Sequence, residues 1–338
     1  FLFYLQSPGI LVFNMTSINK NTVLFLLFVS FLFLVSCEKE IDVDLPRPEE
    51  KLVVEGVIET GAFPYVILSK STPYFDPTDI ASVANSYVSD ATITISDGTI
   101  TNQMTKLCSS SLNSAQQRQL SELVGIPMNL LSTYDICGYV DLSMLGEVGK
   151  TYEIKISWNN EEYVGSTQLV NPVPLDSVWF EVFGDRDSLG FLYAEMTDPV
   201  SKNNYYRWFA QRINSYTYGS LIGQQKDNNF LTPSSSVFDD EFVNGTNFEF
   251  GYGRPVASDK FDDQAPERGF YKVGDTVVVK FCSIDQGVFS FISVAEEQIL
   301  STGSPFATPV NVPSNISNGA LGLWAGYSPH FDTIICKK

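Results

Sequence analysis

The only histidine of the chain, His330, lies in the run Ser-Pro-His-Phe-Asp near the carboxyl end. A histidine that a carboxylate orients is the general base of hydrolases with a serine nucleophile, and Asp332 is near enough in sequence to supply that carboxylate. The chain has no Gly-x-Ser-x-Gly turn to present such a serine. We therefore predict that the protein is not an enzyme and that His330 is a loop or strand-edge residue.

Acidic side chains gather at two places in the second half of the chain, Asp239-Asp240-Glu241 and Asp259 with Asp262-Asp263. Calcium prefers carboxylate and carbonyl oxygens, but neither group has the D-x-D-x-D-G spacing of a calcium loop. Solvated surface loops are the favoured interpretation of both groups. Zinc is not expected either, because there is one histidine and no Cys-x-x-Cys spacing. The sequence predicts no metal and no cofactor.

Four of the five cysteines lie in the body of the chain, and this even number suits an oxidising compartment. They are Cys108, Cys137, Cys282 and Cys336. Sequence alone leaves the pairing open, but separation along the chain favours Cys108 with Cys137 and Cys282 with Cys336.

The fifth cysteine, Cys37, follows an apolar run from Val23 to Val35, and Lys20 is the only cation before it. A cation, an apolar run and a small-residue cleavage site make up an export signal, and this run is too short to span a membrane as a helix. The residues Leu34-Val35-Ser36-Cys37 resemble the lipobox of bacterial lipoproteins, in which the cysteine is acylated and the preceding peptide is removed. The resemblance implies that Cys37 anchors the protein through acyl chains.

Three segments are therefore set apart from the folded body. We interpret residues 1–14, before Met15, as upstream sequence translated by mistake, and residues 15–36 as the signal peptide. Residues 37–50 are predicted to be an acidic linker that its prolines keep extended.

The linker and the overall charge bear on where the protein works. Its residues Glu-Lys-Glu-Ile-Asp, 38–42, resemble the acidic tag that sends Bacteroidetes lipoproteins to the outer face of the outer membrane. We expect the protein on the cell exterior, and an ordinary linker with an anchor facing the periplasm is the alternative. The net charge of −18 disfavours nucleic acid as a partner, because phosphates attract basic surfaces.

Most of the body reads as half-buried strands separated by turns, which predicts an all-β, mainly antiparallel fold with few helices. Residues 51–171 are predicted to be a β-sandwich that ends at a proline-containing joint. A stretch with helical spacing at about 111–131 interrupts the strands, and Cys108 and Cys137 bracket it. A disulfide there would fix the helical insertion to the sheet.

Residues 172–338 are predicted to be a second β domain, either a sandwich or barrel-like. Long aromatic strands open it, a strong strand follows at 273–285, and residues 320–338 return to strand. Between them, residues 286–303 carry one helical apolar face made of Val288, Phe291, Ile292, Ala295 and Ile299. We expect one helix packed on the sheet.

Aromatic residues cluster in this second domain. Trp208 and Phe209 are predicted to pack in the core. The residues Phe248, Phe250 and Tyr252 alternate with Gly251 and Gly253, and we predict an exposed aromatic loop that binds a sugar or a partner protein.

Several runs together resemble the Bacteroidetes lipoproteins grouped as domain of unknown function 4249. They are CEKEIDVDLPRPEEKLVVEGVIETG, LCSSSL, DICGYVDLS, GDTVVVKFCSID and SPFATPVNVPSNISNGALGLWAGYS. The resemblance extends over nearly the whole chain after Cys37, carries the lipidated cysteine to Cys37 and the insertion cysteines to Cys108 and Cys137, and brings no catalytic residue.

The resemblance implies an outer-membrane lipoprotein that serves as a surface accessory subunit of a TonB-dependent transporter, a β-barrel. We therefore expect a non-catalytic binding subunit anchored by lipid. A free-standing lipoprotein that binds extracellular glycan or acts as an adhesin is the alternative.

Overall fold

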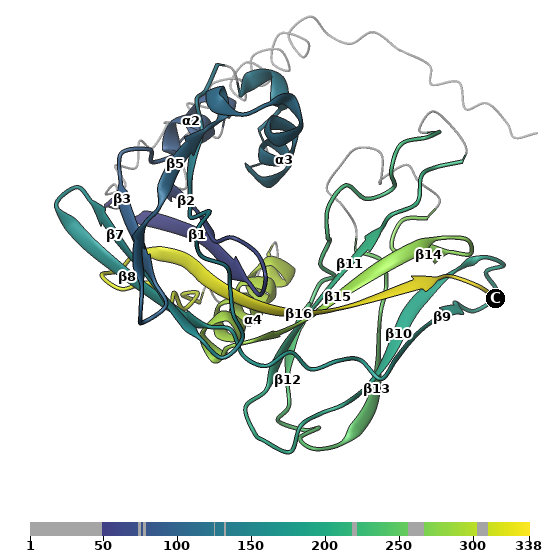
Figure 1. Ribbon diagram of the computed structural model, residues 1–338. Helices are drawn as coiled ribbons and strands as arrows, with labels where there is room; N and C mark the ends of the chain where they lie inside the picture. Colours follow the sequence, from purple (N-terminus) through teal and green to yellow (C-terminus); the bar gives the residue numbers. More distant parts are fainter. Residues whose placement is uncertain are drawn as a thin grey trace, which may run out of the picture. The chain divides into compact units, whose positions relative to one another are not determined.

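The first long strand of the protein, β1 (Leu52–Glu59), pairs in parallel with the last one, β16 (Leu321–Ile335). The computed structural model describes residues 49–338 apart from 74, 75, 77, 78, 125, 132, 218–221, 256–266 and 303–309 (Figure 1). The predicted upstream segment, the signal peptide, the lipidated Cys37 and almost all of the linker lie outside these residues. Glu49–Lys338 forms one compact unit.

The prediction of a strand-rich chain holds, although β13 (Asn247–Tyr252) lies where the sequence predicted a loop. In chain order the other strands are β2 (Tyr65–Lys70), β3 (Thr92–Ser96), β4 (Thr101–Gln103), β5 (Thr105–Cys108), β6 (Cys137–Val140), β7 (Thr151–Trp158), β8 (Glu161–Gln168), β9 (Ser177–Val182), β10 (Leu189–Thr197), β11 (Tyr205–Arg212), β12 (Val237–Asp239), β14 (Tyr271–Lys272) and β15 (Thr276–Ile284). The helices are α2 (Ile80–Ser86), α3 (Ser114–Val124) and α4 (Gln286–Ser301), with 3₁₀ turns η1 (Ser109–Ser111) and η2 (Met128–Leu130). The all-β, mainly antiparallel prediction is confirmed.

One eight-stranded sheet runs through the molecule in the order β12-β11-β15-β16-β1-β2-β6-β5. Its pairs are antiparallel except β1–β16. Side chains alternate between the two faces of a strand, so this sheet has two distinct faces. We call the face that carries Val54 and Trp324 the core face, and the face that carries Val57 and Tyr327 the helix face.

Two smaller sheets cover the core face. The sheet β4-β3-β7-β8 packs on β1 and β2 and encloses the first core, which includes Leu52, Ile154 and Trp324. The sheet of β9, β10, β13 and β14 packs on β11 and β15 and encloses the second core, which includes Trp208, Phe281 and Cys336. Both parts are two-layered, and no closed barrel is formed by the described strands.

The two cores are not divided at residue 171 in the chain, because Ile316, Ala320 and Trp324 belong to the first core. The last strand contributes to both cores. Trp324, near the start of β16, is in the first core, and Ile334, near its end, packs against the second. The domain boundary at residue 171 remains a prediction, and β16 is the element that joins the two parts.

Helix α4 lies on the helix face, where its buried side chains Val288 and Ile292 contact Cys282, Ala325 and Tyr327. The side chain of Asp285 caps the helix by accepting a hydrogen bond from the Val288 amide at 2.9 Å. The predicted helix is thus confirmed. The prediction is wrong for Ile299, which is 71% exposed because the last turn extends beyond the residues on which the helix packs.

The helical insertion also lies where the sequence places it. Cys108 and Cys137 are opposite each other on β5 and β6 and form a disulfide, with 3.9 Å between their Cα atoms. The insertion has a small apolar cluster of its own around Ile126, Leu131 and Ile136. Within the described parts of the chain, the helices are too short or too polar to cross a membrane.

Candidate functional site

His330 and Asp332 lie two residues apart on β16, and 3.4 Å separates His330 Nε2 from Asp332 Oδ2. Both side chains are half-buried. Of the residues that the structure describes, none places a hydroxyl or thiol in hydrogen-bonding contact with His330. His330 lies in β16, so of the two predicted placements, loop or strand edge, the structure gives the strand. The absence of enzymatic activity remains a prediction.

The predicted disulfide between Cys282 and Cys336 is wrong, because both thiols are free and buried. The register of the antiparallel pair β15–β16 explains the error: Cys282 is opposite Pro329, whereas the Cys336 amide donates to the Asp275 carbonyl at the other end of the pair. Burial raises the pKa of each thiol to about 12, so both are protonated and weakly nucleophilic at neutral pH.

The acidic run at 239–241 organises a loop. Asp240 is buried and accepts hydrogen bonds from the Asn203 amide at 3.1 Å and from Asn204 Nδ2 at 3.0 Å. Asp259, Asp262 and Asp263 lie outside the described residues. Among the described residues, Cys108, Asp135 and Cys137 place three potential metal-binding atoms within 4.8 Å of one another. The two sulfurs are bonded to each other in the disulfide, so they are not free to bind a metal.

The prediction of an exposed aromatic loop at Phe248, Phe250 and Tyr252 is wrong. These residues form strand β13, and their rings are half-buried and pack against the second core. Trp208 lies beneath them, with its ring centroid 5.8 Å from that of Phe250 and 5.3 Å from that of Tyr252. Alternation along the strand turns all three rings inward and Gly251 outward.

A groove of about 280 Å³ opens on the helix face beside α4. Strands β1, β2 and β16 form its floor, and α4 and β11 contribute one side chain each. Its lining includes Val57, Ile67, Leu323, Ala325 and Phe291. The groove exists because α4 covers only part of this face of the eight-stranded sheet, and it is mostly apolar.

Four polar side chains line the same groove: Glu55, Tyr65, Arg207 and Tyr327. Arg207 donates from Nη1 to the Tyr327 hydroxyl at 2.5 Å and from Nε to Ser236 Oγ at 3.2 Å. No carboxylate of the described chain pairs with Arg207. The guanidinium is therefore positioned by neutral oxygens and keeps its charge available to a ligand or partner.

Electrostatics in the groove follow from partial burial. Burial is the main cause that raises the pKa of Tyr65 to about 12, and nearby Tyr327 and carboxylates add to it. The Glu55 side chain is open to solvent, but the groove walls desolvate its carboxyl group and raise its pKa. Both phenols stay neutral at physiological pH, so the groove combines neutral hydroxyls with one cation and one carboxylate.

Aromatic and charged groups continue along the helix face beyond the groove. Lys280 forms an ion pair with Glu59, and its ammonium lies 5.3 Å from the ring centroid of Phe209 and 5.6 Å from that of Phe230. Phe331, on β16, is 50% exposed beside Phe230. A partly apolar surface that follows a groove is typical of a site that binds a ligand or a partner.

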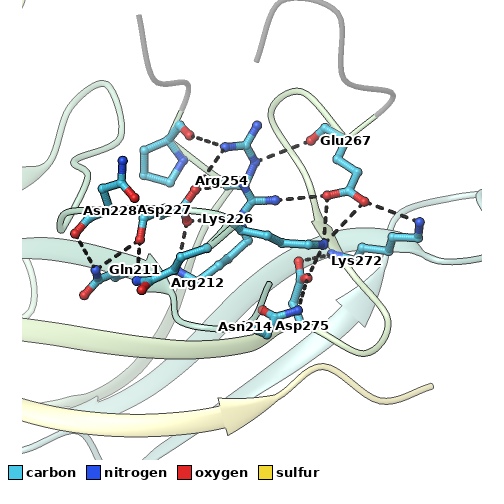
Figure 2. A network of polar contacts seen from close by, with 12 residues as sticks. Gln211, Arg212, Asn214, Lys226, Asp227, Asn228, Arg254, Glu267, Lys272 and Asp275 are labelled. Atoms are coloured by element: carbon cyan, nitrogen blue, oxygen red, sulfur yellow. Dashed lines mark hydrogen bonds and ion pairs between the residues drawn. The ribbon is translucent and has the colours of Figure 1, made fainter. Parts of the chain in front are cut away.

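A buried network of charges underlies the loops near β14 (Figure 2). Arg212 donates to both carboxylate oxygens of Asp227, at 2.7 and 2.9 Å, and to Glu267 at 3.0 Å. Lys226 bridges Glu267 and Asp275 at 3.1 and 2.7 Å. Burial alone would lower the pKa of Arg212, but the hydrogen bonds with Asp227 outweigh it and raise that pKa.

This network joins segments that are distant in sequence, from β11 to the turn before β15, and its side chains are almost fully buried. Among the described residues, these charges face one another in buried ion pairs, which hold the loops in place. We assign the network a structural role.

Sequence reasoning did not find the groove residues or the network. Glu55, Arg207 and Tyr327 stand on three strands whose order in the sheet cannot be read from their spacing. The alternation of residues in these strands does indicate that every second side chain faces away from the core. It does not indicate which strands lie together to form the groove.

Comparison with curated proteins finds no match to this chain. The model of a family described as domain of unknown function 4249 matches residues 38–330, which include the first core, most of the second core, the groove and the buried network, and the protein belongs to this family.

Proposed function

We propose that the protein is a non-catalytic, lipid-anchored lipoprotein of the outer membrane that acts as an accessory binding subunit of a TonB-dependent transporter at the cell exterior. The observation that carries the proposal is the groove on the helix face, where an apolar lining surrounds the guanidinium of Arg207. Buried arginines and aromatic side chains are the groups that dominate protein–protein interfaces.

The sequence supports the anchor. Cys37 closes a lipobox-like run, and the acidic residues after it favour export to the outer face. Acyl chains on Cys37 would hold the body at the membrane surface, where a β-barrel partner is within reach of the groove. The excess of negative charge favours a partner surface that is neutral or basic near the groove.

The experiment is purification of the native protein from membranes in mild detergent. We expect it to co-purify with a β-barrel protein that mass spectrometry identifies. Leu323→Asn places an amide in the apolar lining of the groove, so it is expected to reduce the recovered partner by about 10-fold, which corresponds to about 1.4 kcal/mol of binding free energy.

Ile100→Asn is the matched control, because Ile100 is an exposed residue between β3 and β4, away from the groove. It is expected to leave recovery of the partner unchanged. Wild-type protein that migrates alone at its own mass would contradict the proposal. Equal recovery of the partner protein with folded Leu323→Asn and folded Ile100→Asn would contradict it too.

A further inference from the structure

Strands β9, β10 and β13 lie side by side in one small sheet (Figure 1). Its outer face carries a group of aromatic side chains that belong to neither core. We call this group the aromatic platform. Its members are Trp179, Phe183, Phe191, Tyr193 and Phe270. Phe183 is 48% exposed and the other four are half-buried, although large apolar side chains are usually turned inward.

Two glycines of β13 allow these rings to lie over the strand. A Cβ atom at Gly251 would be 2.6 Å from the Tyr193 ring, and one at Gly253 would be 3.1 Å from the Phe191 ring. The same strand therefore turns Phe250 and Tyr252 toward the second core and presents only backbone on its outer face. Side chains larger than glycine would lift Tyr193 away from the sheet.

The rings of the platform form two nearly parallel pairs. Trp179 and Tyr193 have centroids 5.9 Å apart and planes inclined by 20°. Phe191 and Phe270 have centroids 5.2 Å apart and planes inclined by 12°. Within each pair the rings are stacked, and Phe183 is tilted by 50° to Phe191 and by 40° to Phe270.

Carboxylates border the rings. Glu181 accepts a hydrogen bond from Trp179 Nε1 at 2.8 Å, which fixes the indole. Glu195 and Glu249 are directly opposite each other on β10 and β13. Ser177 Oγ donates to Glu195 at 3.4 Å, and no cation of the described chain pairs with either carboxylate. Like charges at opposed positions destabilise a sheet, so this arrangement costs stability unless a ligand provides donors to the carboxylates.

The chemistry of the platform narrows the class of ligand. A nucleobase would stack on flat rings, but its phosphates are repelled by a protein of net charge −18. A quaternary ammonium is recognised by a cage of rings. The group that comes nearest to a cage is Phe183, Phe191 and Phe270, and there the Arg186 guanidinium already lies 4.2 Å from the Phe270 centroid. A neutral sugar ring has an apolar C–H face that stacks on an aromatic ring, and it has hydroxyl groups that donate to carboxylates.

We propose that the aromatic platform binds a neutral saccharide, with Trp179 and Tyr193 stacking on sugar rings and Glu249 and Glu195 accepting hydrogen bonds from hydroxyls. The site is separate from the groove on the helix face, and the proposal does not depend on the transporter. It gives the protein a second binding surface for soluble sugars or for polysaccharide chains.

The test is affinity electrophoresis of the full-length protein in detergent, through gels that contain neutral β-glucan, mannan or galactan, together with fluorescence titration by soluble oligosaccharides of the same three kinds. We expect retardation in at least one gel. Trp179→Ala and Tyr193→Ala are each expected to weaken it by about 10-fold. Phe242→Ala, which removes a ring that is 90% exposed elsewhere, is expected to have no effect.

Two further variants distinguish saccharide binding at the platform from cation binding and from binding in the groove. Glu249→Gln keeps an acceptor oxygen, so saccharide binding is expected to change by less than about 3-fold, whereas binding of a cation such as tetramethylammonium would be lost. Leu323→Asn, in the groove, is expected to leave the retardation unchanged. Failure of all three polysaccharides and their oligosaccharides to bind the wild-type protein would overturn the proposal. Retardation that survives both platform substitutions, or binding of tetramethylammonium in place of sugar, would overturn it equally.

Discussion

Replacing Arg212 with methionine is expected to lower the free energy of unfolding by about 3–5 kcal/mol, because it removes the cation that donates hydrogen bonds to the buried carboxylate of Asp227. The side chains of Arg212, Asp227 and Glu267 are 1%, 4% and 1% exposed, so water cannot compensate for the lost hydrogen bonds. Lys226 would still contact Glu267, but Asp227 would lose both of its hydrogen bonds from the guanidinium. The measurement is equilibrium unfolding in denaturant, monitored by tryptophan fluorescence.

The control is Lys155→Met, which removes a cation from an exposed ion pair with Glu162. Exposed pairs of this kind contribute about 1 kcal/mol or less, so the two methionine substitutions should differ clearly. A loss below about 1 kcal/mol for Arg212→Met would contradict the buried network.

Replacing Trp324 with alanine is expected to cost about 3–5 kcal/mol, since a fully buried ring would leave a cavity. The indole also donates to the Tyr152 carbonyl at 3.0 Å, and that buried acceptor would lose its partner. The ring lies over Gly56, where a Cβ atom would be only 2.6 Å from it. Trp324 therefore joins the last strand to the first core, and unfolding in denaturant is again the measurement.

Phe331→Ala is the control for Trp324→Ala, because it removes a ring from the same strand outside the first core. Phe331 is half-exposed on the helix face, and its removal is expected to cost less than about 1 kcal/mol. If both substitutions had the same cost, β16 would not hold the first core together in the way described here.

Local patterns predicted the elements but not their partners. Alternating residues in 51–60 and 151–158 indicate strands correctly, and the bracketing cysteines at 108 and 137 indicate a closed insertion. The pairing of β1 with β16 joins segments more than 260 residues apart, and no turn between them records it. The error at Cys282 and Cys336 has the same cause, because their separation in sequence does not determine how β15 and β16 pair.

The aromatic residues of β13 show how one pattern supports two opposite interpretations. Phe248, Phe250 and Tyr252 alternate with Gly251 and Gly253, and alternation alone does not tell which set faces the core. The structure places the rings inside, and the glycines make room for Phe191 and Tyr193 on the outer face. The buried network gave no signal at all, because Arg212, Asp227 and Glu267 meet only through tertiary packing.

The intact mass of the native protein, extracted from the membranes of cells that produce it, tests the central claim most directly. The proposed lipid-anchored binding subunit predicts the mass of residues 37–338 increased by acyl chains, with the modified residue at Cys37. A polypeptide that carries no acyl chain and still has the residues before Cys37 attached would contradict it.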